Sequence, residues 1–286
     1  MSEVSVPELF GKFLLSVHPF PEDRVRAVAR RVAAVDVLLE ALSTSWVTET
    51  GSWRHETGVR GAGAVDLTVS LLGDVPASSE QVVRSVKAAL KRVVPAAGVR
   101  VAGGAVVVVE PGVRMSWSVR PAFPTPDGGY WVPDPGPGSG WVRSCPDAYA
   151  VFLAATDEMT GGGVRRLSRL LKVWKQHHQV PVSSFYLEAK VVQYMVGQRS
   201  FNAIYDLCFV LEQLDESGLA PLLDPTVDGA GIVAVYRTRD EQKAAAAVGE
   251  AARAARSGLD RYRAGNDAGA VRALSEIFGS VFGHVL

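Results

Sequence analysis

The chain has 286 residues, of which 48% are hydrophobic, and this is enough for one large domain or two lobes around a packed core. Lysine plus arginine and aspartate plus glutamate each number 30, so the formal net charge is zero. This balance excludes an overall positive field that would hold a long nucleic acid, and any such contact has to come from a local cluster.

The two cysteines, Cys145 and Cys208, lie far apart and have neither the spacing of a zinc site nor that of a disulfide framework. The N-terminal segment lacks the basic-then-apolar pattern of a signal peptide. No apolar run approaches the roughly 20 residues that a membrane-spanning helix needs. We therefore expect a soluble, cytoplasmic protein.

A long helix is predicted near the N-terminus. Glu22 and Asp23 follow Pro21 and place negative charge in the first turn, where it stabilises the helix dipole. Apolar residues then recur at three- and four-residue spacing, which predicts an amphipathic helix of roughly twenty residues. These residues are Val25, Val28, Val32, Val35, Leu39 and Leu42.

The next part of the chain is predicted to mix strands and helices. After a turn at Gly51-Ser52 and a loop, β-branched residues and leucines predict a strand over residues 65–72. An amphipathic helix is expected over 79–93, followed by strands at 105–110 and 114–120 that meet at a hairpin turn. The proline- and glycine-rich residues 121–147 predict a loop packed on the fold.

The remainder of the chain is mostly helical in pattern. Helices are expected at 148–159, 163–178, 183–197, 201–216, 239–264 and 267–283. A long helix, a small mixed sheet and a helical second half together predict an α+β fold with two lobes.

Several short segments follow one another in an order that carries a family resemblance. Gly51-Ser52 is followed by Thr57-Gly58-Val59-Arg60, by Pro121-Ala122-Phe123, and by the loop from Asp127 to Asp134 with Trp141 after it. In the second half, Arg166–Trp174 and Ser183–Glu188 continue the series. This series resembles the bacterial cGAS/DncV-like nucleotidyltransferases (CD-NTases, SMODS-type), which belong to the polymerase-β-like superfamily.

The resemblance implies a fold and a biological setting. Residues 1–147 would form a nucleotidyltransferase core, with a small mixed sheet and a long N-terminal spine helix. Residues 148–286 would form a helical, oligoadenylate-synthetase-like lobe. The family makes nucleotide second messengers in bacterial anti-phage defence (CBASS), and its substrates are nucleoside triphosphates.

The resemblance also implies that this chain lacks two of the three carboxylates that the family uses to bind metal ions. The family holds two metal ions with three carboxylates, two as Asp-x-Asp on one strand and one on the neighbouring strand, and the metals activate the attacking hydroxyl. The matching positions are Ala64, Asp66 and Ser118, so only one acid remains. Asp66 would hold one Mg²⁺ weakly, through a bound triphosphate, or none. Arg120 shares the Ser118 face and adds positive charge.

Phosphate contacts are implied at Gly51, Ser52, Lys172 and Ser184, where the family's nucleotide-binding residues fall. Without the resemblance, Lys172 with Arg165 and Arg169 would be interpreted as a solvated basic face of a helix. Tyr130, Trp131 and Trp141 would either stack on a base or anchor the loop, and we favour anchoring for the two tryptophans.

Three functions remain open. The first is a catalytically degenerate CD-NTase-like protein that binds a nucleotide, an oligonucleotide or RNA, and we favour it. The second is an active nucleotidyltransferase with an altered metal site that makes a cyclic or linear oligonucleotide. The third is a structural module that pairs with an active homologue and binds no triphosphate.

Overall fold

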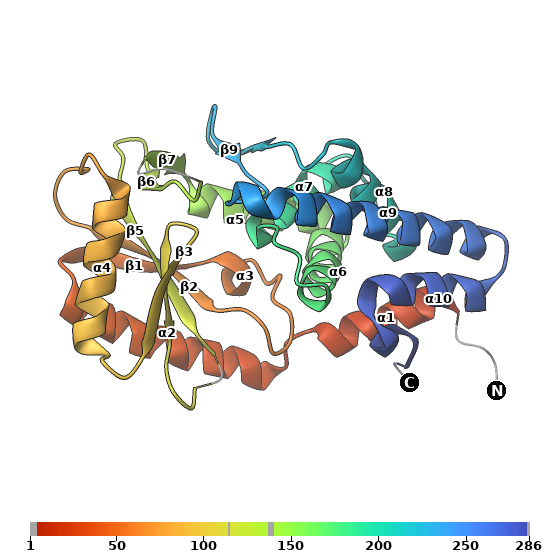
Figure 1. Cartoon of the computed structure of the whole chain (residues 1–286), viewed down its shortest axis with the longest axis horizontal. Helices are drawn as coiled ribbons and strands as arrows, with labels where there is room; N and C mark the ends of the chain where they lie inside the picture. The colour runs from red at the N-terminus through yellow and green to blue at the C-terminus, as the bar shows by residue number, and fades with distance from the viewer. Residues whose placement is uncertain (1–4, 114, 137–139, 285–286) are drawn as a thin grey trace. The chain divides into compact units, whose positions relative to one another are not determined.

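A computed structural model describes residues 5–113, 115–136 and 140–284 of the chain (Figure 1). The chain divides into two compact units. The core unit consists of Pro19–Phe152 with Leu223–Ala230, and the helical unit consists of the chain up to His18, Leu153–Leu222 and the chain from Gly231 onward. The division falls inside one helix, α5 (Pro146–Met159).

The core unit is built on a mixed sheet whose five main strands have the order β1-β2-β5-β4-β3. Their bounds are β1 (Thr44–Thr50), β2 (Val65–Leu71), β3 (Gly98–Ala102), β4 (Ala105–Val109) and β5 (Trp117–Pro124). β2 and β5 run parallel, and the other neighbouring pairs run antiparallel. Two short strands, β6 (Tyr130–Pro133) and β7 (Trp141–Ser144), continue from the end of β5.

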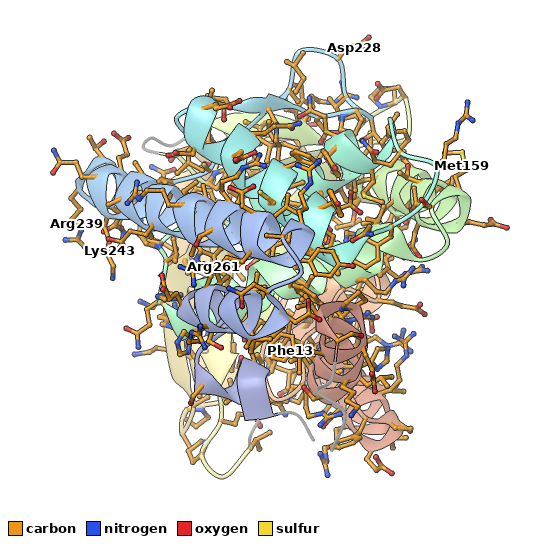
Figure 2. The ribbon with its side chains drawn as sticks, turned by 90° about the vertical axis from the view of Figure 1, so that its right-hand side faces the viewer. Phe13, Met159, Asp228, Arg239, Lys243 and Arg261 are labelled. Atoms are coloured by element: carbon orange, nitrogen blue, oxygen red, sulfur yellow. The ribbon has the colours of Figure 1, made fainter. Side chains whose placement is uncertain are left out.

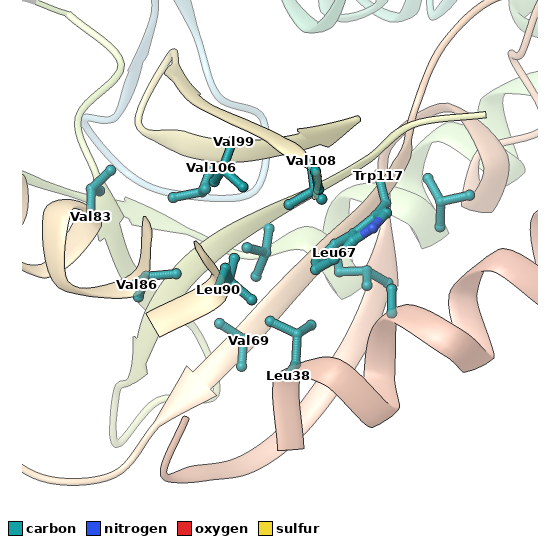
Figure 3. Packing of buried hydrophobic residues seen from close by; sticks show 14 of the residues in the cluster. Leu38, Leu67, Val69, Val83, Val86, Leu90, Val99, Val106, Val108 and Trp117 are labelled. Atoms are coloured by element: carbon teal, nitrogen blue, oxygen red, sulfur yellow. The ribbon is translucent and has the colours of Figure 1, made fainter. Parts of the chain in front are cut away.

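Side-chain alternation gives this sheet two different faces. Val65, Leu67 and Val69 of β2 enter the hydrophobic core, while Asp66 and Thr68 between them take the opposite face. The core face is covered by α2 (Pro21–Ala41) and α4 (Ser79–Val93), and Figure 3 shows side chains from both helices directed at β2, β4 and Trp117. Each fully buried aliphatic side chain in this layer contributes about 1.5–3 kcal/mol.

The apolar stripe that identified α2 in the sequence is not its buried face. The helix buries Ala27, Ala34 and Leu38 against the sheet. Val25 and Leu39 are exposed instead, as are Val28 and Val32 between them. The helix itself is confirmed, with bounds close to the predicted ones.

The helical unit contains α1 (Val6–Val17), the end of α5, α6 (Gly163–His177), α7 (Ser184–Met195), α8 (Ala203–Glu216), α9 (Glu241–Arg263) and α10 (Asp267–Phe278). α9 and α10 lie side by side (Figure 1). α1 packs on α6, α8 and α10, and Figure 2 labels Phe13 where α1 meets α10. There Phe10 and Phe13 place their rings 5.0 Å from those of Phe282 and Phe278, respectively.

The predicted α+β class and the predicted helices are confirmed, but the account of residues 121–147 as a loop is wrong. β5 continues to Pro124, and β6 and β7 form an antiparallel ladder. The prolines are accommodated because Pro124 and Pro133 stand at strand ends, where a missing N–H is tolerated. Residues 137–139 of this segment lie outside the described residues, as does Arg114 of the predicted second strand.

Other elements that were not predicted include α1, β1 and β3. β1 was missed because most of its residues are polar, and its alternate residues face away from the core. None of the helices among the described residues has the length and apolarity that crossing a bilayer requires.

Two adjacent leucines of α2 test its orientation. Leu38 is 0% exposed and Leu39 is 57% exposed. We expect Leu38→Ala to lower the free energy of unfolding by about 2–5 kcal/mol, because it leaves a cavity under the sheet. Leu39→Ala should change it by less than about 0.5 kcal/mol. Urea unfolding at low protein concentration measures both, and equal losses would contradict this orientation.

Candidate functional site

Gly51 begins a tight turn at the end of β1. Its φ is +67°, and the short helix α3 (Gly51–Arg54) starts at this residue. A Cβ at this position would lie 2.4 Å from Asp66 Oδ2, so a side chain here would collide with the acid of β2. Only glycine allows both the backbone conformation and the close approach. The turn therefore places the Gly51 backbone directly against the Asp66 carboxylate.

Ser52 follows in the same turn and is half-buried. Its backbone carbonyl accepts a hydrogen bond from Thr57 N at 3.0 Å, and Gly51 O accepts one from His55 N at 3.0 Å. Within the described part of the chain, the Ser52 hydroxyl donates to no protein group. A free hydroxyl beside a glycine turn is an available donor for an anionic oxygen.

Asp66 and Ser118 are register partners in the parallel pair of β2 and β5. Ser118 Oγ donates a hydrogen bond of 2.6 Å to Asp66 Oδ1. One carboxylate oxygen of Asp66 therefore accepts from Ser118, while the other lies against Gly51. The structure thus brings Gly51, Asp66 and Ser118 together, as the sequence predicted for these positions.

The donor atoms at this site do not suit a pair of divalent cations. Two such ions about 3.5–4 Å apart need several carboxylate oxygens between them. Ala64 contributes a methyl group immediately before β2, and Ser118 contributes a hydroxyl that is already directed at Asp66. Among the described residues there is no group of three or more His, Cys, Asp or Glu side chains that could hold a metal.

Other charged groups in or beside the sheet have partners elsewhere. Glu49 of β1 lies 3.8 Å from Arg31 of α2. Glu110 pairs with Arg30 of α2 and accepts from Trp117 Nε1 at 3.1 Å. The Arg30 guanidinium holds the pKa of the Glu110 carboxyl below its usual range. Arg120 does not direct its charge at Asp66, because its guanidinium donates to Gly103 O at 3.0 Å, in the turn between β3 and β4.

The two remaining sequence-predicted residues, Lys172 and Ser184, lie on α6 and α7 of the helical unit. Lys172 Nζ donates to Glu188 Oε2 at 2.8 Å, and both side chains are buried, with 7% and 3% exposed. Ser184 is bound by a different lysine, because its Oγ accepts from Lys175 Nζ at 2.7 Å. The phosphate contact that the resemblance implied for Lys172 stays a prediction.

Lys175 was missed by the sequence reasoning. Burial, with a further contribution from the positive charge of Lys172, lowers the pKa of the Lys175 amine to about 8. Its recorded partner within the described residues is the neutral Ser184 hydroxyl, and no carboxylate pairs with it there. The signal that would have found it is its spacing, because Lys175 follows Lys172 by three residues and so shares its helix face.

The alternative of a solvated basic face on α6 is wrong. Arg169 and Lys172 are buried, and Arg165 pairs with the buried Asp157 at 2.6 Å. Asp157 Oδ1 also accepts from Arg165 N at 2.9 Å, in the first turn of α6.

The aromatic residues of the 121–147 segment pack within the core unit. Trp141 Nε1 donates to Pro76 O at 2.7 Å, and its ring meets Phe123 edge-on with centroids 5.3 Å apart. Tyr130 is buried, and its hydroxyl accepts from Trp46 Nε1 at 3.0 Å. Trp131 lies under the guanidinium of Arg143, which is 5.4 Å from the ring centroid. Anchoring is thus the observed role of Trp141.

No protein-family model matches this sequence, and no curated protein is significantly similar to it. Solved structures do match its fold. The Escherichia coli MS115-1 CdnC with ATP has a TM-score of 0.75 and 16% identity, covering 98% of this chain and 99% of that one. The Bradyrhizobium diazoefficiens CD-NTase CdnG with GTP has a TM-score of 0.71 and 13% identity, covering 97% and 96%.

A third match is the Vibrio cholerae DncV cyclic AMP-GMP synthase in complex with a linear intermediate. Its TM-score is 0.60 and its identity is 14%, with 82% of this chain and 69% of that chain covered. The predicted fold is therefore confirmed: this chain has the polymerase-β-like fold of the CD-NTases.

The buried amine of Lys175 leads to a pH prediction. Its folded-state pKa of about 8 lies below the unfolded value of 10.5, so the folded state loses the proton first. The cost of burying the charge is present below pH 8 and is relieved as pH rises from 8 to 10.5. Lys175→Met should therefore raise the free energy of unfolding at pH 7, by at most about 3 kcal/mol.

Urea unfolding between pH 7 and 10.5 measures this difference. The increase in the free energy of unfolding caused by Lys175→Met should become smaller as the pH rises across that range. Lys243→Met on the exposed side of α9, labelled in Figure 2, is the control and should show no pH-dependent change. An increase in the free energy of unfolding that does not change with pH would contradict a lowered pKa at Lys175.

Proposed function

We propose that this chain binds a nucleoside triphosphate or an oligonucleotide and does not transfer nucleotidyl groups. It would act by binding in cytoplasmic nucleotide signalling of the bacterial anti-phage (CBASS) type. The observation that carries the proposal is the 2.6 Å hydrogen bond from Ser118 Oγ to Asp66 Oδ1, next to a Gly51-Ser52 turn that keeps a free hydroxyl.

The argument against transfer concerns the ligands for metal ions. Nucleotidyl transfer by two metals requires that cations activate the attacking hydroxyl and neutralise the charge that develops on the phosphates. Here a serine and an alanine stand at two of the three acid positions. The remaining carboxylate already accepts a hydrogen bond from the serine. An active enzyme with an altered site would need a further acid, and the acids in or beside the sheet, Glu49 and Glu110, pair with Arg31 and Arg30 of α2.

The argument for binding concerns the groups that are kept. The Gly51 turn supplies backbone next to a carboxylate, and Ser52 supplies a hydroxyl without a protein partner among the described residues. On the helical unit, Lys175 is a half-buried amine without a carboxylate partner. A buried unpaired charge is costly, and an anionic group such as a phosphate would relieve that cost. The structural neighbours that hold ATP and GTP support this class of ligand.

Ser52 is the residue on which to test binding. We expect ATP or GTP to raise the melting temperature of the unaltered chain by several degrees, because a ligand at 100 times its dissociation constant stabilises by about 2.7 kcal/mol. Ser52→Ala should raise the dissociation constant of that nucleotide about tenfold, because one hydrogen bond to a charged group is lost. Ser43→Ala, an exposed serine of the same unit, is the matched control and should change nothing.

Lys172 is unsuitable for this test. Removing it would break the buried ion pair with Glu188 and would confuse folding with binding. The absence of a thermal shift for every nucleoside triphosphate would overturn the binding proposal and favour an interaction module. A labelled oligonucleotide product made from triphosphates with Mg²⁺ or Mn²⁺ would overturn the proposal that transfer is lost.

A further inference from the structure

α2 carries a continuous apolar strip outside the core of its unit. Val25, Val32 and Leu39 stand at the a positions of a heptad repeat, and Val28, Val35 and Leu42 stand at the d positions. Four of them are largely exposed: Val25 by 69%, Val28 by 43%, Val32 by 53% and Leu39 by 57%. Val35 is half-buried, whereas Leu42 follows the last residue of α2 in extended backbone and packs against the core of the unit. We call the five residues Val25, Val28, Val32, Val35 and Leu39 the α2 seam.

The seam and the buried face are different sides of one helix. At about 100° per residue, Val32 points roughly 160° away from Ala34, which faces the sheet. From Val25 to Leu39 the seam is roughly 21 Å long. Single exposed hydrophobic residues are common, but an unbroken strip with a 3.5-residue period is the pattern of a helix that meets another helix.

The charges beside the seam distinguish the possible partners. Arg24 and Arg31 stand at the first two g positions, and Glu22 and Asp36 stand at e positions. The third g position is Leu38, which is buried under the sheet, and Arg24 donates to Trp53 O at 3.0 Å. In an antiparallel pair of these helices, g faces g and e faces e, so arginine would meet arginine and acid would meet acid. In a parallel pair, g faces the following e of the other helix, so Arg31 would meet Asp36 twice, once on each side.

We propose that the α2 seam pairs two copies of this chain as a parallel two-stranded coil, held in register by Arg31 with Asp36 of the second copy. Both groups are available for this. Asp36 is exposed and has no ion pair within the described residues, and Arg31 is 43% exposed, with Glu49 at 3.8 Å as its recorded ionic partner there.

The length of the seam determines how tight the pair is. The seam spans about two heptads, fewer than the roughly three to four over which a coiled-coil pattern is sustained. The dimer should therefore be in equilibrium with the monomer at micromolar concentrations. The surface lies on the core unit and does not involve the Gly51-Ser52 turn, so pairing is independent of nucleotide binding.

Sedimentation velocity of the full chain from about 1 to 200 µM tests the pairing, over the concentration range that a weak interface requires. The unaltered chain should shift from monomer to dimer across this range. Val32→Glu should raise the dissociation constant at least tenfold, because it places two acids opposite each other in the seam. Ala33→Glu, one residue away on the exposed side of the helix, should leave it unchanged. Thermal unfolding controls for folding, and neither exposed substitution should lower the melting temperature.

A charge-swap cycle tests the register. Arg31→Glu alone and Asp36→Arg alone should each weaken the dimer, and the two together should restore it. For orientation, Val25→Cys should give an oxidised dimer readily, because the a positions face each other only in a parallel pair. The unaltered chain is its control, since Cys145 is half-buried and Cys208 is buried.

Three results would overturn the proposal. They are a monomer at every concentration, a dimer that Val32→Glu leaves intact, and a dimer without cross-linking at position 25.

Discussion

The proposed loss of metal binding depends on the hydrogen bond between Ser118 and Asp66. The parallel pairing of β2 with β5 makes the two residues register partners, so whatever stands at position 118 faces the acid at position 66. With a carboxylate there, two acids would attract cations. With a serine, the hydroxyl satisfies the acid within the protein, at 2.6 Å. Gly51 stays necessary in either case, because a side chain at that position would collide with Asp66.

Two lysines of α6, Lys172 and Lys175, have different kinds of partner. Lys172 is neutralised by Glu188 inside the unit, whereas Lys175, one turn later, has only the Ser184 hydroxyl among the described residues. Burial lowers the pKa of Lys175 to about 8, so the protein bears the cost of a charge that no carboxylate offsets. Each unit therefore supports the binding proposal in its own way. The core unit has the Gly51-Ser52 turn beside a single acid, and the helical unit has Lys175, which has no carboxylate partner among the described residues.

Much of this fold was predictable from the residue pattern. The helices other than α1 and α3 were found because their apolar periods span ten or more residues, and β2 was found because β-branched residues concentrate there. β1 was missed because its polar alternate residues hide the strand, and β6 and β7 were missed because prolines surround them. The α2 seam shows a different limit: the period located the helix, but two faces of that helix are apolar and only packing shows which is buried.

The part of the candidate site that could be predicted is the part set by residue positions along the strands. Ala64, Asp66 and Ser118 follow from counting along β2 and β5, but the direction of Arg120 and the pairing of Lys172 depend on tertiary contacts. The most direct measurement of the central claim restores the acids with Ala64→Asp and Ser118→Asp and supplies four labelled nucleoside triphosphates in Mg²⁺ and Mn²⁺. The account predicts an oligonucleotide product from the restored chain alone; product from the unaltered chain, or from neither, would contradict it.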